Sequence, residues 1–288
     1  MKNILFVILI AVVISSCKSK TEQAAADTTS AAIANDAETE KLIAQFKPII
    51  EGVWVKKSYV QSVLSTLSPY KSWKEFWGVA CLEIYLPDDG SDSTHVGYSL
   101  NNHEGSDFVL FLKQGHLLTS LKIDLPDYDV KNNFYELGYE INKGETNLAL
   151  YHYSAKGEII DKTLYTKVAS RAKGDGDAAW GIEHITNKQL FSGKYELIGD
   201  NVPVEVNFND DGNATGFPNA KNYYILTDFM AGPANNLDQI TFNLYQSDQA
   251  DYTYKFNADT LSIYDIKTNP DSTLLLVGKL RYKLVRQK

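Results

Sequence analysis

Five short segments from the first half of the chain recur, in the same order, in the second half. Glu51-Gly-Val-Trp54 matches Ser192-Gly-Lys-Tyr195, and the alternating run 82–90, which ends in Asp-Asp-Gly, matches 204–212. The later pairs are 138–142 with 253–257, 148–151 with 261–264, and 165–168 with 281–284. A preserved order over this distance is typical of a duplicated domain and not of a solenoid. The sequence therefore predicts two similar folded units in tandem.

Each predicted unit consists of short runs in which apolar and polar residues alternate, as they do in half-buried strands. In the run 135–141 the tyrosines, leucine and isoleucine share one face, and Glu136 and Glu140 occupy the other. Eight such runs start near residues 52, 79, 94, 107, 116, 133, 146 and 160, and eight more start near 193, 202, 213, 222, 239, 252, 260 and 274. This spacing predicts an all-β fold of two tandem eight-stranded antiparallel barrels.

The ends of these runs set the expected boundaries of the two units. We expect the first barrel over 48–170, a linker over 171–189 and the second barrel over 190–288. The linker contains Lys173-Gly-Asp-Gly-Asp177, a composition that is typical of a loop.

The first unit carries an insert that the second unit lacks. Tyr59 and Leu67 belong to an apolar pattern with helical spacing, which predicts a short helix lying over one end of the barrel. The aromatic residues Trp73, Phe76 and Trp77 follow it. Because the second unit forms its barrel without this insert, these five residues are the candidate site for a ligand or partner. The alternative is a helical plug that buries both tryptophans as ordinary core.

Residues 1–16 have the pattern of an export signal. Lys2 precedes the apolar run 4–14, which is shorter than the roughly 20 residues that a transmembrane helix needs. The run ends in Ile14-Ser-Ser-Cys17, which resembles the bacterial lipobox. That resemblance implies a lipoprotein that is cleaved before Cys17 and carries acyl chains, such as palmitate, on this cysteine. Two or three chains on one cysteine would hold it firmly at a membrane.

Residues 17–47 have the composition of a flexible tether, rich in Ala, Thr and Ser, with a short helix expected over 38–46. The residues directly after Cys17 are basic, not acidic, which favours the periplasmic face of the outer membrane over the cell surface.

Gly52-Val-Trp54, at the head of eight strand-like runs, resembles the Gly-x-Trp signature of the lipocalins and related calycin barrels. The second unit carries the variant Gly193-Lys-Tyr195. The resemblance implies that each aromatic packs beneath its barrel against a cationic side chain of the last strand. Lys167 and Lys283 are at matching places for this role, with Arg281 as an alternative.

Several function classes find no support in the sequence. The formal net charge of −8 argues against a nucleic-acid partner. The histidines do not show the spacing of a metal-binding motif, and Asp124, Asp127 and Asp129 fit a solvated turn better than a calcium loop. Cys81 lies in an apolar run and is expected to be a small buried side chain. No cofactor or metal is therefore expected.

The expected function is that of a non-enzymatic binding module in the cell envelope, which holds a small apolar ligand or a protein partner. The alternative is an envelope enzyme of the hydrolase type. Binding is favoured because the sequence shows no nucleophile, base and orienting group in a recognisable pattern.

Overall fold

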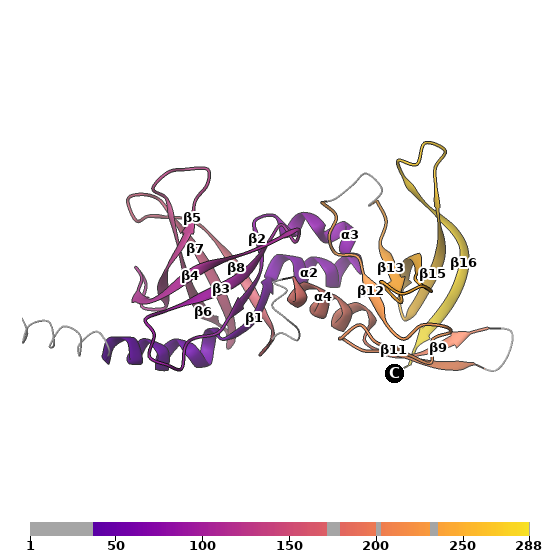
Figure 1. The fold of residues 1–288 in the computed structure, drawn as a ribbon, viewed down its shortest axis with the longest axis horizontal. Coiled ribbons are helices and arrows are strands. Elements are labelled where there is room, and N and C mark those ends of the chain that lie inside the picture. The colour runs from indigo at the N-terminus through magenta and orange to yellow at the C-terminus, as the bar shows by residue number, and fades with distance from the viewer. Residues whose placement is uncertain (1–36, 172–178, 200–202, 231–235, 288) are drawn as a thin grey trace, which may run out of the picture.

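The computed structural model describes residues 37–171, 179–199, 203–230 and 236–287. Within these ranges the chain forms two antiparallel sheets of eight strands each, one after the other in sequence. Figure 1 shows the first sheet at the left, the second at the right and a group of helices between them. The predicted all-β fold of two tandem eight-stranded barrels is confirmed.

Unit one is a closed barrel, in which every strand pairs with its neighbours in sequence and the last strand returns to the first. Its strands are β1 (Gly52–Lys56), β2 (Val79–Ile84), β3 (Ser93–Leu100), β4 (Glu104–Gln114), β5 (Ser120–Pro126), β6 (Phe134–Asn142), β7 (Glu145–Tyr153) and β8 (Ile159–Ala169). Side chains from alternate positions fill the interior, among them Leu82, Leu110, Leu137 and Leu148, all fully buried. One face of each strand thus supplies the core, as the alternating pattern predicts.

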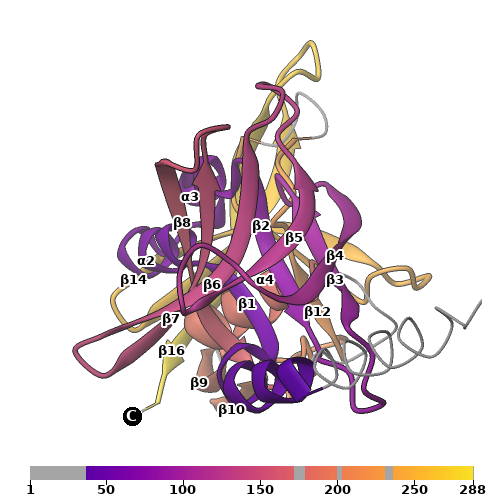
Figure 2. The same cartoon turned by 90° about the vertical axis from the view of Figure 1, so that its left-hand side faces the viewer.

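A helix over residues 37–50 closes one end of this barrel (Figures 1 and 2). Its side chains Leu42, Phe46 and Ile50 are buried in the barrel core. The ring of Phe46 meets that of Tyr139 edge-on, with 5.6 Å between the centroids. The helix expected at the end of the tether is therefore present, but it belongs to the folded barrel, whose floor it forms, and the boundary expected at residue 47 lies too late in the chain.

Unit two is a nearly closed sheet with the strand order β11-β10-β9-β16-β15-β14-β13-β12. Its strands are β9 (Gly193–Ile198), β10 (Val204–Phe208), β11 (Ala214–Thr215), β12 (Tyr223–Ile225), β13 (Gln239–Phe242), β14 (Ala250–Asn257), β15 (Thr260–Thr268) and β16 (Leu275–Arg286). An isolated bridge between Asn213 and Asn222 joins its two edges. The short β11 and β12 leave little more than this bridge to complete the barrel.

The five repeated sequence segments lie on strands of equal rank in the two units. They fall on the first strands β1 and β9, the second strands β2 and β10, the sixth strands β6 and β14, the seventh strands β7 and β15, and the eighth strands β8 and β16. The duplication read from the sequence is thus also a duplication of strand order.

Helices fill the space between the two barrels (Figure 1). Three follow β1: α2 (Lys57–Thr66), α3 (Pro69–Ser72) and the 3-10 helix η1 (Trp73–Phe76). Two more precede β9: α4 (Trp180–Thr186) and the π-helical turn η2 (Asn187–Phe191). The insert was expected over an end of barrel one, and this placement is wrong. Tyr59 and Val63 of α2 instead join one hydrophobic cluster with Val55 of β1 and with Leu261 and Ile263 of unit two, because that position covers apolar surface on both sides.

The segment expected as a linker contains the second group of helices. Residues 172–178, which include the Gly- and Asp-rich stretch and Asp175 and Asp177, lie outside the described residues. In the part that follows, Ile182 (fully buried) and Ile185 (5% exposed) belong to the cluster shared by the two units. Only the first part of the expected linker has the composition of a loop. The rest forms α4, whose isoleucine side chains are buried, and the start of η2.

Gly52 and Gly193 open the first strand of each unit with positive φ angles of +129° and +137°. Only glycine adopts this conformation readily, because other residues place a Cβ against the backbone. At Gly52 a Cβ would also lie 2.6 Å from the carbonyl oxygen of Ala169. The glycine of the Gly-x-aromatic motif therefore has the same backbone role in both units.

The aromatic residue of the motif is buried in each unit and lies against a cation. Trp54 donates its indole N–H to the Ile50 carbonyl at 2.7 Å, and Lys167 Nζ lies 5.7 Å from the ring centroid. In unit two the cation over Tyr195 is Arg286, at 5.0 Å from the centroid, and not Lys283 or Arg281.

The sequence match misplaced the cation of unit two because β8 and β16 were aligned three residues out of structural register. The structure pairs Lys167 with Trp54 and Arg286 with Tyr195 across the first strand of each unit. Lys283 is exposed, one position from the fully buried Leu284, so it belongs to the opposite face of the strand.

The predicted export signal, the lipobox and Cys17 lie outside the described residues. Within the described ranges, the structure contains no helix that is both long enough and apolar enough to span a membrane.

Candidate functional site

Barrel one has a cavity of about 200 Å³ at the end opposite the 37–50 helix. It is reached past the start of β2 and the loop between β5 and β6, and its walls are side chains that point into the barrel. The helix packs at the end of the barrel where β1 begins (Figures 1 and 2), and the residues of this mouth lie at the other end, where β2 begins and β5 ends. The closed floor and open mouth together make a blind pocket.

The inner wall of the pocket is apolar and aromatic. Leu100, Leu125 and Leu150 line it together with Tyr98 and Tyr165, and all five belong to the barrel core or pack against it. The hydroxyl of Tyr165 donates to the carbonyl of Val79 at 3.0 Å, and burial raises the pKa of Tyr165 far above its usual range. This tyrosine is therefore neutral and part of the fixed wall.

The rim of the pocket is acidic. Asp127, Asp129 and Asp161 line it, and none of the lining residues is Lys or Arg. Two backbone N–H groups, from Val130 at 3.0 Å and Asp129 at 2.8 Å, donate to Asp127 and lower its pKa to about 2. The Asp127 side chain is only 5% exposed, so a nearly enclosed carboxylate stays ionised at the mouth.

His152 connects two of the rim carboxylates. Its Nε2 lies 2.9 Å from Asp127 Oδ2, and its Nδ1 lies 3.3 Å from Asp161 Oδ2. Tyr135 stacks on the imidazole, with 4.4 Å between the centroids and 14° between the planes. Burial, followed by the charges of the nearby aspartates, raises the pKa of Tyr135, so its hydroxyl stays protonated. These contacts hold the rim in one arrangement.

Trp77 stands at the edge of the same pocket with 63% of its surface exposed. Its backbone is fixed: Lys56 Nζ donates to the Trp77 carbonyl at 2.7 Å, and the next residue, Gly78, donates its N–H to Asn101 Oδ1, also at 2.7 Å. A large aromatic ring on a fixed backbone can bind a partner at a low cost in conformational entropy.

The other residues of the predicted site are not at this mouth. Tyr59 and Phe76 are buried in the cluster between the units and stack with 3.9 Å between their centroids. Trp73 is partly buried, and Leu67 lines a second cavity, between the insert and unit two. Of the five residues predicted as the site, only Trp77 lines this pocket. The alternative, a helical plug that buries both tryptophans, is also wrong for Trp77, which is exposed.

The cavity that Leu67 lines has a volume of about 390 Å³, and the charged residues at its wall are Lys71, Asp238 and Lys255. Ser68 Oγ donates to Asp238 at 2.5 Å and the backbone N–H of Tyr70 donates to it at 2.8 Å. Burial raises the pKa of Asp238, and these two donors act in the opposite direction. The carboxylate ties the start of α3 to unit two, which is a structural use of the group.

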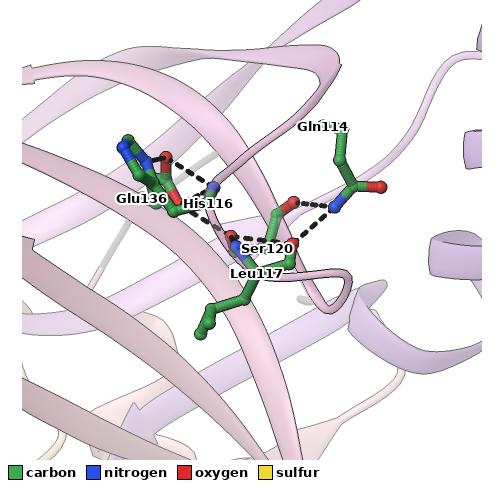
Figure 3. Close-up of polar contacts among 5 residues, drawn as sticks. All are labelled: Gln114, His116, Leu117, Ser120 and Glu136. Carbon is green, nitrogen blue, oxygen red and sulfur yellow. Dashed lines mark hydrogen bonds and ion pairs between the residues drawn. The ribbon is translucent and has the colours of Figure 1, made fainter. Parts of the chain in front are cut away.

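A second group of polar residues, Ser120, Glu136 and His116, contains the residue types of a hydrolase triad (Figure 3). Ser120 Oγ donates to Glu136 Oε2 at 2.7 Å, and His116 Nδ1 lies 2.6 Å from Glu136 Oε1. The carboxylate thus lies between the hydroxyl and the imidazole. A triad needs the imidazole next to the hydroxyl so that it can take the proton.

Burial also shows what this group does. Ser120 is fully buried and Glu136 is 1% exposed, and the backbone N–H of His116 donates to Glu136 as well. The His116 ring stacks on Tyr153, with 4.9 Å between the centroids. The group therefore pins the loop between β4 and β5 onto the outer face of the barrel.

The sequence analysis missed Asp161 as a pocket residue and His152 as the partner of the rim aspartates, and it treated Asp127 and Asp129 as a solvated turn. Period-two alternation would place His152 on the same face as Leu148 and Leu150, which is the inward face. The sequence pattern does not show that the closed barrel brings the ends of β5, β7 and β8 together at one mouth, so it could not predict that these residues meet.

Comparisons with protein-family models, with curated proteins and with solved structures each gave no match for this chain.

Proposed function

We propose that this chain is a non-enzymatic binding module of the cell envelope, and that barrel one holds a small ligand with an apolar or aromatic body and a cationic head. The observation that carries the proposal is the composition of one pocket, in which apolar walls end at a rim with three aspartates and an exposed tryptophan. The walls suit an apolar body. Carboxylates and an indole ring are the groups that attract a cation.

The pocket also limits the size of the ligand. Its volume of about 200 Å³ lies below the roughly 300–1,000 Å³ typical of sites for drug-sized molecules. A single fused ring system or a short alkyl chain matches this space. The resemblance of the Gly-x-Trp motif to the lipocalins supports the same reading, since eight-stranded barrels of that kind hold one small ligand.

A matched pair of probes tests the proposal. Naphthylmethylamine and naphthylacetic acid share one ring and carry opposite charges at neutral pH. We expect isothermal titration calorimetry to show binding of the amine and much weaker binding of the acid. Trp77→Ala removes the ring at the rim and should weaken the amine about fivefold, given roughly 1 kcal/mol for a cation over tryptophan.

Tyr245→Ala is the matched control, because Tyr245 is an aromatic residue of unit two that is 93% exposed and remote from the pocket lining. It should leave the affinity unchanged. Binding of neither probe, equal binding of both, or an equal effect of the two variants would overturn the assignment of the ligand to this mouth.

We further propose that the mature protein begins at Cys17 and is held at the outer membrane, facing the periplasm, by lipid on that cysteine. The support is the short apolar run that ends in Ile14-Ser-Ser-Cys17. Cys17→Ser should move the protein from the membrane pellet to the soluble periplasmic fraction. Protein that stays in the pellet without detergent would contradict the anchor.

A further inference from the structure

Three potential metal ligands meet where the helix before unit two approaches the turn between β10 and β11. His184 lies on α4, and Asp210 and Asp211 lie on that turn. One ligand atom from each residue lies within 4.8 Å of the other two. His184 Nε2 is 4.0 Å from Asp210 Oδ2, which is too long for a hydrogen bond.

Two buried polar atoms of the same helical segment have no hydrogen-bond partner. They are His184 Nδ1 and Asn187 Oδ1, on residues that are 9% and 7% exposed. An unsatisfied buried polar atom costs about 1–3 kcal/mol, so native proteins seldom leave one without a reason. The Asn187 amide lies against the aspartate turn, with its Nδ2 3.7 Å from the position of a Cβ on Gly212.

The surroundings hold these groups in place before any ion arrives. Trp180 stacks on the His184 imidazole, with 4.7 Å between the centroids and 14° between the planes. The side chain of Asn209 accepts hydrogen bonds from the backbone N–H groups of Asp211 at 3.1 Å and Asn213 at 2.9 Å, which fixes the turn.

We propose that His184, Asp210 and Asp211 bind one divalent transition-metal ion of the zinc class. One imidazole nitrogen with two carboxylates is a donor set that such ions accept at three protein positions, with water completing the coordination. Calcium and magnesium prefer sites made of oxygen ligands alone, so the histidine selects against them. The ion joins α4 to the turn of unit two and lies apart from the mouth of barrel one.

Calorimetric titration of the purified full chain with Zn²⁺, and separately with Ca²⁺, tests the site. We expect one Zn²⁺ per chain and no comparable binding of Ca²⁺. The double variant Asp210→Asn, Asp211→Asn changes two turn residues that are not buried and should weaken Zn²⁺ binding by at least about 10- to 100-fold. The double variant His95→Gln, Asp107→Asn removes an exposed histidine–aspartate pair of barrel one and should bind Zn²⁺ as the wild type does.

A second readout separates ligation from damage to the fold. Zn²⁺ should raise the melting temperature of the wild type and of the barrel-one variant, but not that of the turn variant, because only an ion that binds the native state stabilises it. Visible absorption of bound Co²⁺ should disappear in His184→Gln while its circular dichroism matches that of the wild type. The proposal fails if the wild type binds no stoichiometric Zn²⁺, or if the turn variant binds it as tightly as the control.

Discussion

Two glycines and one carboxylate show how single residues fix this structure. Gly52 and Gly193 start their barrels with φ values of +129° and +137°, which side chains with a Cβ rarely adopt. Asp127 owes its low pKa, about 2, mainly to backbone donors of its own loop. Each residue therefore makes a separate and measurable prediction.

Gly52→Ala should destabilise the fold more than Gly193→Ala. Both substitutions impose a strained backbone, which costs on the order of 1–3 kcal/mol. At Gly52 the new methyl would also meet Ala169 O at 2.6 Å, whereas at Gly193 no atom lies within 4 Å. Urea unfolding measures the difference. Gly97→Ala, in a strand with ordinary φ and open space, is the control and should be nearly neutral; equal losses at all three sites would refute the explanation.

Asp127→Asn should destabilise the protein above pH 4 and much less near pH 2. The folded-state pKa of Asp127 is lowered from 3.8 to about 2. A lowered pKa gives stability that is present above the unfolded value and is lost as the pH falls through the folded value. Melting temperatures between pH 2 and pH 7 check this. Asp129→Asn, two residues away on the same rim, is the comparison; a pH-independent gap for Asp127→Asn would contradict the assignment.

At the scale of elements, each barrel begins with a helix that supplies part of its core. Ile50, at the end of the first helix, accepts a hydrogen bond from Trp54 at 2.7 Å, and Leu190, at the end of the second, accepts one from Tyr195 at 3.4 Å. Phe46 and Phe191 are fully buried side chains of these helices. The duplicated element is thus a helix, a glycine, an aromatic residue and eight strands.

Phe46→Ala and Phe191→Ala should each cost about 3–5 kcal/mol, the range for removing a buried aromatic ring. We expect both helices to be required for folding, although the sequence analysis assigned most of the first helix to a tether and most of the second to a linker. Guanidinium unfolding of the purified variants gives the free energies. Leu118→Ala removes a side chain that is 81% exposed and should change stability little; a loss below 1 kcal/mol at either phenylalanine would show that its helix is dispensable.

The strands were predictable because period-two alternation is local and the repeat supplied a second copy of each pattern. Predicted starts such as Gly52, Val79, Gly193 and Gln239 agree with β1, β2, β9 and β13. The cation over Tyr195 was not predictable, because sequence similarity matches 165–168 with 281–284, whereas strand pairing puts Lys167 and Arg286 at equivalent positions. The place of the insert was also not predictable, since Tyr59 and Val63 pack on residues of the other unit that are distant in sequence.

At the scale of the whole molecule, the two sheets are separate but their cores are not. One cluster runs from Val53 and Cys81 on barrel one, through Ile182 of α4, to Tyr254 and Leu284 of unit two. Asn102 Nδ2 donates to the Thr227 carbonyl at 2.8 Å and adds a polar contact between the units. Apolar surface of each barrel is therefore buried by the other.

The two units should unfold in one cooperative step. Separating them would expose the cluster that they share, which costs about 25 cal/mol for each Å² of apolar surface. Hydrogen exchange followed in increasing urea should show amides of β1 and β15 losing protection at the same midpoint. Loss of protection in β15 while β1 stays protected would show that the shared cluster does not couple the units.

The described part of the chain begins with the helix that forms the floor of barrel one (Figure 1), and the pocket lies at the other end of this barrel. If lipid on Cys17 holds the chain as proposed, the barrel is attached to the membrane through its closed end. The pocket then opens away from the bilayer. Cargo would then arrive by diffusion through the aqueous space, not by sideways extraction from the lipid leaflet. With the proposed anchor, the direction in which the barrel opens relative to the point of attachment would decide which molecules can reach the pocket.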